Sequence, residues 1–197
     1  MGFCMQIIDK LINLQNLYIH DTAVQKNGTK LVGLNTQTPP LAKHYIFAPM
    51  DPSVRKHLTE SYKPGFPEEL LALYQFANGF DLFWKCVLIG KRGFRIPRAQ
   101  LCIYGVPGTM RDPQQIEPFN ISVEDLNRPE MTPDTWLKFG SYQIIPDSGN
   151  QLDEYAMFVD TYTHEVHAVK RANNKCESEQ VWPSIDACLC NLFDLIN

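Results

Sequence analysis

Hydrophobic residues recur at helical spacing between Lys63 and Leu82, and we expect the rest of the chain to be organised around this stretch. Pro67 and the two glutamates after it are typical of a helix start, because proline needs no N–H partner there and carboxylates favour the positive end of the helix dipole. We expect the helix to stop at Asn78-Gly79, since glycine readily adopts the left-handed conformation of a helix C-terminus. One apolar face is predicted, formed by Leu70, Leu71, Leu73, Tyr74 and Ala77.

Three other segments carry helical patterns or helix start signals. Residues 3–19 place their isoleucines and leucines on one broad stripe. Asp51-Pro52 is typical of an N-cap and a first helical residue, and predicts a short helix that ends at about Tyr62. Pro183 opens a terminal helix whose apolar stripe comprises Ile185, Cys188, Leu189, Leu192, Phe193 and Ile196.

Short apolar runs bounded by turn residues replace the helical pattern in the middle of the chain and predict strands. The turn-rich residues 28–43 are expected to include one short strand as well. Because the strands cluster between helices at both chain ends, the pattern predicts a single α+β domain with a mostly antiparallel (mixed) central sheet. The expected strands are Lys30–Leu34, Trp84–Ile89, Leu101–Tyr104, Trp136–Ile145, Tyr155–Asp160 and Glu165–Lys170, the last two joined by a hairpin turn at Thr161–His164.

Charge is distributed unevenly along the 197 residues, although the net charge is only −4. The first 111 residues hold 13 of the 18 Lys+Arg, and the remainder holds 15 of the 22 Asp+Glu. Such an asymmetry can place an acidic and a basic face on one body and steer a charged partner. The overall acidic balance does not favour direct binding to nucleic acid.

Six scattered cysteines and an opening segment without a basic export signal predict reduced thiols in a cytoplasmic protein. No run approaches the roughly 18 apolar residues of a membrane span. The pair His164 and His167 has the wrong spacing for the helical zinc motif, and Cys188 is expected to pack in the core. We therefore expect no metal site, no cofactor and no catalytic residue set.

The order of these segments resembles the SUKH superfamily, which groups bacterial toxin-immunity proteins with fungal regulators of cell-wall synthesis. Pro67-Glu-Glu-Leu70, Leu73-Tyr74-x-Phe76 and Asn78-Gly79 are similar to its opening signature, and the later strands and closing helix follow in the same order. The resemblance covers roughly residues 60–197. It implies one SUKH-like domain over residues 1–197, in which residues 1–60 form an N-terminal helical extension.

This resemblance implies a binding module and not an enzyme, namely an immunity-type protein that neutralises a cognate toxin by stoichiometric binding. Because a nuclease toxin domain carries basic residues for its substrate, an acidic rim on this protein could meet them. Asp147, Asp153 and Glu154 are the candidate rim residues. Trp84 and Tyr104 are candidate aromatic anchors, with core packing as the alternative for both.

Two other classes of function remain open at this stage. One is an intracellular protein-interaction scaffold of the cell-wall-regulator type, which joins a cellular complex without any toxin. The other is a hydrolase that uses the loop carboxylates or His164 and His167. The sequence leaves the oligomeric state open.

Overall fold

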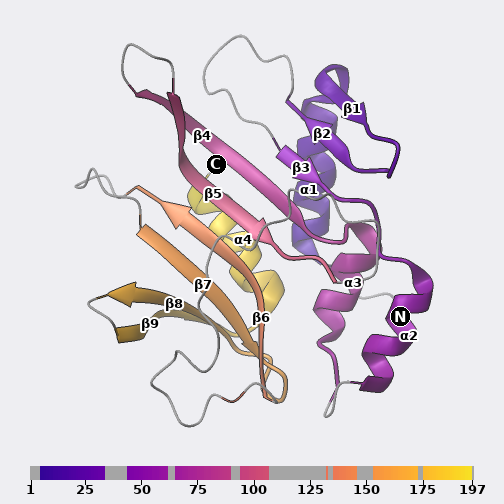
Figure 1. Cartoon of the computed structure of the whole chain (residues 1–197), viewed down its shortest axis with the longest axis vertical. Coiled ribbons are helices and arrows are strands. Elements are labelled where there is room, and N and C mark those ends of the chain that lie inside the picture. The colour runs from indigo at the N-terminus through magenta and orange to yellow at the C-terminus, as the bar shows by residue number, and fades with distance from the viewer. Residues whose placement is uncertain are drawn as a thin grey trace.

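The computed structural model describes residues 5–33, 44–61, 65–89, 94–106, 132, 135–145, 153–172 and 175–196. In these residues, nine strands lie side by side in chain order and form one sheet (Figure 1). Every neighbouring pair among them is antiparallel. The strands are β1 (Thr22–Val24), β2 (Lys30–Val32), β3 (His44–Ile46), β4 (Phe80–Ile89), β5 (Phe94–Ile103), β6 (Trp136–Ile144), β7 (Asp153–Asp160), β8 (Val166–Ala172) and β9 (Lys175–Trp182).

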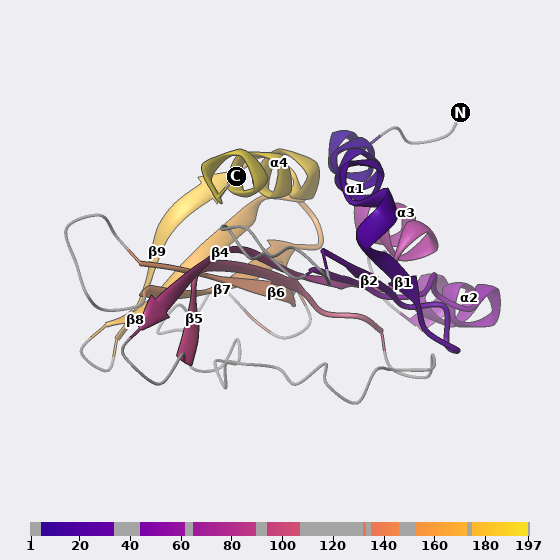
Figure 2. The same cartoon turned by 90° about the horizontal axis from the view of Figure 1, so that it is seen from above.

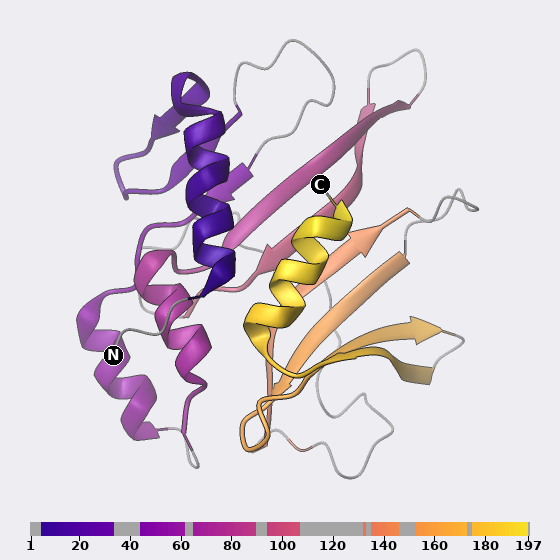
Figure 3. The same cartoon turned by 180° about the vertical axis from the view of Figure 1, so that it is seen from behind.

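Helices from both ends of the chain cover one face of this sheet. The four α-helices of the described residues are α1 (Gln6–Leu17), α2 (Pro52–Ser61), α3 (Glu68–Phe76) and α4 (Ile185–Ile196), and a short 3-10 helix, Ile19–Asp21, follows α1. Figures 2 and 3 show α1 and α4 lying next to each other on the same side of the sheet, with α2 and α3 towards one end. The α+β single-domain architecture predicted from the sequence is therefore confirmed.

Strand alternation divides the sheet into two faces. Met157 of β7 contacts Cys188 of α4, with 3.8 Å between the two sulfur atoms, so Met157 marks the face that α4 covers. We call this the helix face and the opposite side the far face. Since alternate residues of a strand point the same way, Tyr155 shares the helix face with Met157, and Tyr142 opposite it on β6 stacks on its ring at 4.5 Å between centroids.

The closing helix has the buried stripe that the sequence predicted. All six residues of that stripe are buried, and Ser184 accepts a hydrogen bond at its hydroxyl oxygen from the N–H of Ala187 at 3.1 Å. At the start of α2, the Asp51 carboxylate accepts hydrogen bonds from the N–H of Ser53 at 2.8 Å and from its hydroxyl at 2.7 Å, as predicted for an N-cap.

The ends of α3 differ in detail from the prediction. Pro67 is the N-cap and not the first helical residue, and its carbonyl accepts the N–H of Leu71 at 3.1 Å. At the other end Ala77 is already extended, with φ −150° and ψ 126°. The left-handed glycine, Gly79 with φ 93°, follows two residues later and leads the chain into β4.

Two short strands and one edge strand were not predicted. β1 and β3 span three residues each, which is too short to display a period of two. β9 is rich in charged and polar residues, as is common for a strand at the sheet edge. We expected residues 1–60 to form a helical extension. They contain α1 and most of α2, and they also contribute the three strands β1, β2 and β3 to the sheet. No helix of the described segments is long and apolar enough to span a membrane.

Two carboxylates connect the N-terminal ends of three helices, α3, α4 and α1. Glu69, buried in the first turn of α3, accepts hydrogen bonds from the N–H groups of Ile185 and Asp186 at 2.7 and 3.3 Å. The carboxylate of Asp186, in turn, accepts the N–H groups of Gln6 and Ile7 at 3.1 and 3.0 Å. Both carboxylates lie at helix N-termini, where unpaired N–H groups and the positive end of the dipole favour negative charge.

We predict that Glu69→Ala destabilises the fold, because the buried N–H groups at the start of α4 lose their acceptor. The free energy of unfolding, measured by urea denaturation, should fall by about 1–3 kcal/mol. Its exposed neighbour offers a matched control: Glu68→Ala should change the same quantity by no more than about 0.5 kcal/mol. Equal losses in the two variants would show that helix propensity or charge, and not the cap on α4, accounts for the effect.

Candidate functional site

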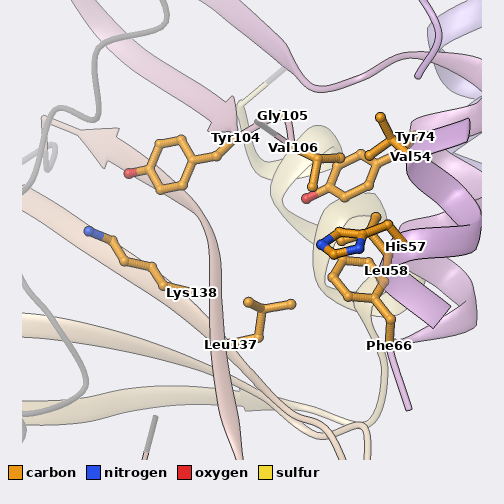
Figure 4. A pocket seen from close by; sticks show the side chains of 10 residues that line it. All are labelled: Val54, His57, Leu58, Phe66, Tyr74, Tyr104, Gly105, Val106, Leu137 and Lys138. Atoms are coloured by element: carbon orange, nitrogen blue, oxygen red, sulfur yellow. The ribbon is translucent and has the colours of Figure 1, made fainter. Parts of the chain in front are cut away.

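A cavity of about 390 Å³ lies between the helices α2 and α3 and the strands β5 and β6 (Figure 4). Side chains from the helices form one side, and residues at the end of β5 and the start of β6 form the other. We call it the α2–β6 pocket. The residues that line it are Val54, His57, Leu58, Phe66, Tyr74, Tyr104, Gly105, Val106, Leu137 and Lys138.

The helix side of the pocket is apolar and well buried. Leu58, Phe66 and Tyr74 are only 6%, 7% and 4% exposed, and the rings of Phe66 and Tyr74 pack in a tilted arrangement with centroids 6.1 Å apart. The carbonyl of Tyr74 accepts a hydrogen bond from the N–H of Met50 at 2.8 Å. This bond fastens the segment before α2 to the last turn of α3, so the two helices that form this side are held together.

Asn78 fixes the opposite side. Its side-chain oxygen accepts the N–H of Val106 at 2.9 Å, and a Cβ on Gly105 would lie 2.3 Å from the backbone oxygen of Asn78. Only glycine therefore allows the chain to pass this close after β5. The N–H of Tyr104 donates to the carbonyl of Phe139 at 2.9 Å and ties the same segment to β6.

Two of the lining side chains, those of His57 and Lys138, carry nitrogen atoms. The ammonium of Lys138 lies 5.5 Å from the centroid of the Tyr104 ring, and His57 stands on the helix side (Figure 4). The described lining residues include no carboxylate. Such a cavity can hold an apolar group.

Of the two aromatic anchor candidates, the structure places one at this pocket. Tyr104 is partly buried and lines the pocket. The sequence had suggested Tyr104 as an anchor but had not indicated a pocket at this position. Trp84 belongs to β4, but its side chain lies outside the described part of the structure. The pocket itself could not be recognised from the sequence, because its residues come from segments that lie between positions 54 and 138.

The acidic candidates do not share one face. Asp147 lies outside the described residues, while Asp153 and Glu154 are the first two residues of β7 and so point to opposite faces. Asp153 pairs with Lys170 at 2.9 Å, and the Lys170 ammonium also lies over the Tyr155 ring on the helix face. Glu154 is exposed on the far face and accepts a hydrogen bond from the side-chain amide of Gln143 at 3.3 Å. Partial burial raises the pKa of the Glu154 carboxyl.

A second polar cluster lies where β4 meets β5. Asp81 accepts a hydrogen bond from the side chain of Gln100 at 2.8 Å, and Cys102 is its partner on β5. Burial raises the pKa of Asp81 to about 6, although the bond from Gln100 opposes that shift. Burial and the nearby Asp81 also raise the pKa of the Cys102 thiol. A thiol that stays protonated is a poor nucleophile, so this pair does not form a reactive cysteine site.

Cys188, Cys190 and the two histidines of the candidate pair take structural positions. Burial raises the pKa of Cys188 and, to about 11, that of Cys190. His164 occupies the β7–β8 turn with φ 65°, and His167 packs edge-on against Trp136 with centroids 4.7 Å apart. Across the described residues, no group of three or more His, Cys, Asp or Glu side chains could hold a metal ion.

We predict that Asp81→Asn stabilises the protein at neutral pH. Since the folded state raises the pKa of Asp81 from about 3.8 to about 6, the associated stability is complete below pH 3.8 and is lost as the pH rises through 6. Asparagine stays uncharged and can still accept from Gln100, so the free energy of unfolding at pH 7.5 should rise by about 1–2 kcal/mol. Denaturant titrations at pH 4 and pH 7.5 measure it.

The pH dependence separates this effect from a general effect of removing charge. The gain should nearly vanish at pH 4, and the exposed Asp9→Asn should show no comparable gain at either pH. A gain for Asp81→Asn that is as large at pH 4 as at pH 7.5 would contradict the assignment.

No family model, curated protein or solved structure compared with this chain matches it.

Proposed function

We propose that the protein is an immunity-type binding module that neutralises a cognate toxin, a nuclease domain in our hypothesis, by stoichiometric binding. The observation that carries the proposal is the arrangement of α3, the Asn78-Gly79 exit and α4 on one antiparallel sheet. The resemblance to the SUKH superfamily rests on these segments in this order. That these segments pack together on one sheet supports the proposal.

The chemistry of the described side chains supports binding better than turnover. Burial keeps the Cys102 and Cys188 thiols protonated, and the α2–β6 pocket is lined mainly by apolar and aromatic residues. Side chains of this kind provide contact area and anchoring sites for a partner. This supports a task that depends on a stable complex.

Glu154 is the best-supported contact of the predicted acidic rim. The charge of Asp153 is compensated within the protein by Lys170, whereas Glu154 is exposed at the start of β7. An exposed surface carboxylate attracts the basic groups with which a nuclease binds phosphate, and it accelerates the encounter of the two proteins. We therefore assign the steering contact to Glu154 and not to a continuous rim.

Capture from the native cell, followed by a growth assay, tests the function. We expect the tagged protein to retain one partner in a 1:1 complex, which light scattering on the purified pair would measure. The partner expressed alone should arrest growth, and co-expression with this protein should restore growth. A harmless partner, or a multi-protein assembly without a toxic component, would favour the scaffold function instead.

We predict that Glu154→Lys slows association with that partner, because it replaces an attractive charge by a repulsive one. At low ionic strength the association rate constant should fall roughly threefold or more, and the difference should shrink as salt is added. Surface plasmon resonance at two salt concentrations measures both effects. Asp9→Lys makes the same charge change at an exposed position of α1 and should leave the rate nearly unchanged; equal effects of the two variants would remove Glu154 from the contact.

A further inference from the structure

Beyond toxin binding, we propose that β1 pairs antiparallel with β1 of a second copy of the chain, so that two nine-stranded sheets join at their edges. β1 lies at the edge of the sheet, and β2 is its one neighbour among the described strands (Figure 1). The direction of its backbone groups, its apolar surroundings and its charges each contribute to this assignment.

Backbone groups at two positions of β1 point out of the sheet. The carbonyl of Asp21 accepts the N–H of Gly33 at 3.0 Å, and the N–H of Gln25 donates across the same β1–β2 hairpin at 2.8 Å. The residues at both ends of β1 therefore bond towards β2. Because the backbone groups of an antiparallel strand alternate between its two sides, those of Thr22 and Val24 point away from β2. They form the hydrogen-bonding edge that a further strand can use.

The two edges of the sheet differ in the charge of their strands. The sequence of β9, at the opposite edge, contains one lysine and two glutamates, and charges on an edge strand oppose pairing with a further strand. β1 consists of Thr22, Ala23 and Val24 and carries no charged side chain. The edge formed by β1 is therefore the one suited to accept another strand.

Exposed apolar side chains gather at the same edge. Seven large hydrophobic side chains of the described residues are exposed, and three of them, Leu17, Ile19 and Val24, fall within residues 17–24. Each of the three is between 64% and 74% exposed. A second copy related by a twofold axis would bring these side chains of both chains to or beside one shared edge, where their burial favours association.

The sequence around β1 is complementary to itself when two copies run in opposite directions. With the twofold axis at Ala23, Thr22 of each copy lies opposite Val24 of the other, so the outward positions of both strands form hydrogen-bonded pairs. Asp21 before one strand then comes near Lys26 after the other, and these opposite charges attract. Strands that ran parallel would bring like charges together instead. A second copy, in antiparallel orientation, is therefore the partner that fits this edge.

Sedimentation equilibrium of the full chain, at concentrations up to about 1 mM, tests the proposal. Because edge pairing buries a small interface, we expect a monomer–dimer equilibrium with a dissociation constant on the order of 100 μM. Val24→Lys places a charge on the edge and should weaken the dimer at least about tenfold, whereas Val181→Lys, at an exposed position of the opposite edge strand, should not. Val24→Pro removes the outward N–H without adding a charge and should also weaken the dimer.

The charges test the direction of the strands. Asp21→Lys and Lys26→Asp should each weaken the dimer roughly threefold or more at low ionic strength, because like charges then lie near each other. The double variant restores the attraction with its signs reversed, so its dissociation constant should return towards that of the wild-type protein.

Three results would overturn the assignment: a wild-type chain that stays monomeric at the highest concentration, equal losses for Val24→Lys and Val181→Lys, or no recovery in the double charge variant. Thermal unfolding of each variant verifies that it is folded. Glu154, the proposed contact for the toxin, lies on β7 and not at this edge. The sedimentation sample contains no toxin, so failure of the dimer leaves the proposed toxin binding untouched.

Discussion

The carboxylate of Glu69 is the contact on which the arrangement of the helices depends. It lies in the first turn of α3 and accepts the N–H groups that open α4, and Asp186 of α4 then accepts those that open α1. The free N–H groups of a helix start must find acceptors when they are buried. Here the start of α4 finds its acceptor on α3, and the start of α1 finds its acceptor on α4. The two ends of the chain, more than 170 residues apart, are thereby positioned by the central helix.

The exit of α3 is as consequential as its start. Asn78 follows the helix, binds the backbone at Ala48 through its N–H, and holds Val106 with its side chain. Gly79 then turns the chain into β4, which pairs with both β3 and β5. One short segment thus connects the helix layer, the middle of the sheet and the strand side of the α2–β6 pocket. The segment that carries the superfamily resemblance is also the one that shapes this cavity.

Periodic patterns over a single element were readable from the sequence, and contacts between distant elements were not. The stripe of α4 and the β7–β8 hairpin follow from local spacing, and both are confirmed. Strands of three residues, such as β1, carry too few positions to show a period. Sequence alone treats Glu68 and Glu69 alike, although only Glu69 is buried and caps α4. The pocket depends on four separate segments meeting, which no local pattern encodes.

The start of β7 decides how the acidic candidates can act. As soon as Asp153 and Glu154 belong to a strand, alternation sends them to opposite faces. Asp153 then meets Lys170, whose ammonium also lies over the Tyr155 ring, and its charge contributes to packing within the helix face. Glu154 accepts its hydrogen bond from the neutral amide of Gln143, so its negative charge is not compensated by that contact. The sheet thus separates a carboxylate that is paired within the protein from one that is exposed, and we propose that the exposed one steers a charged partner.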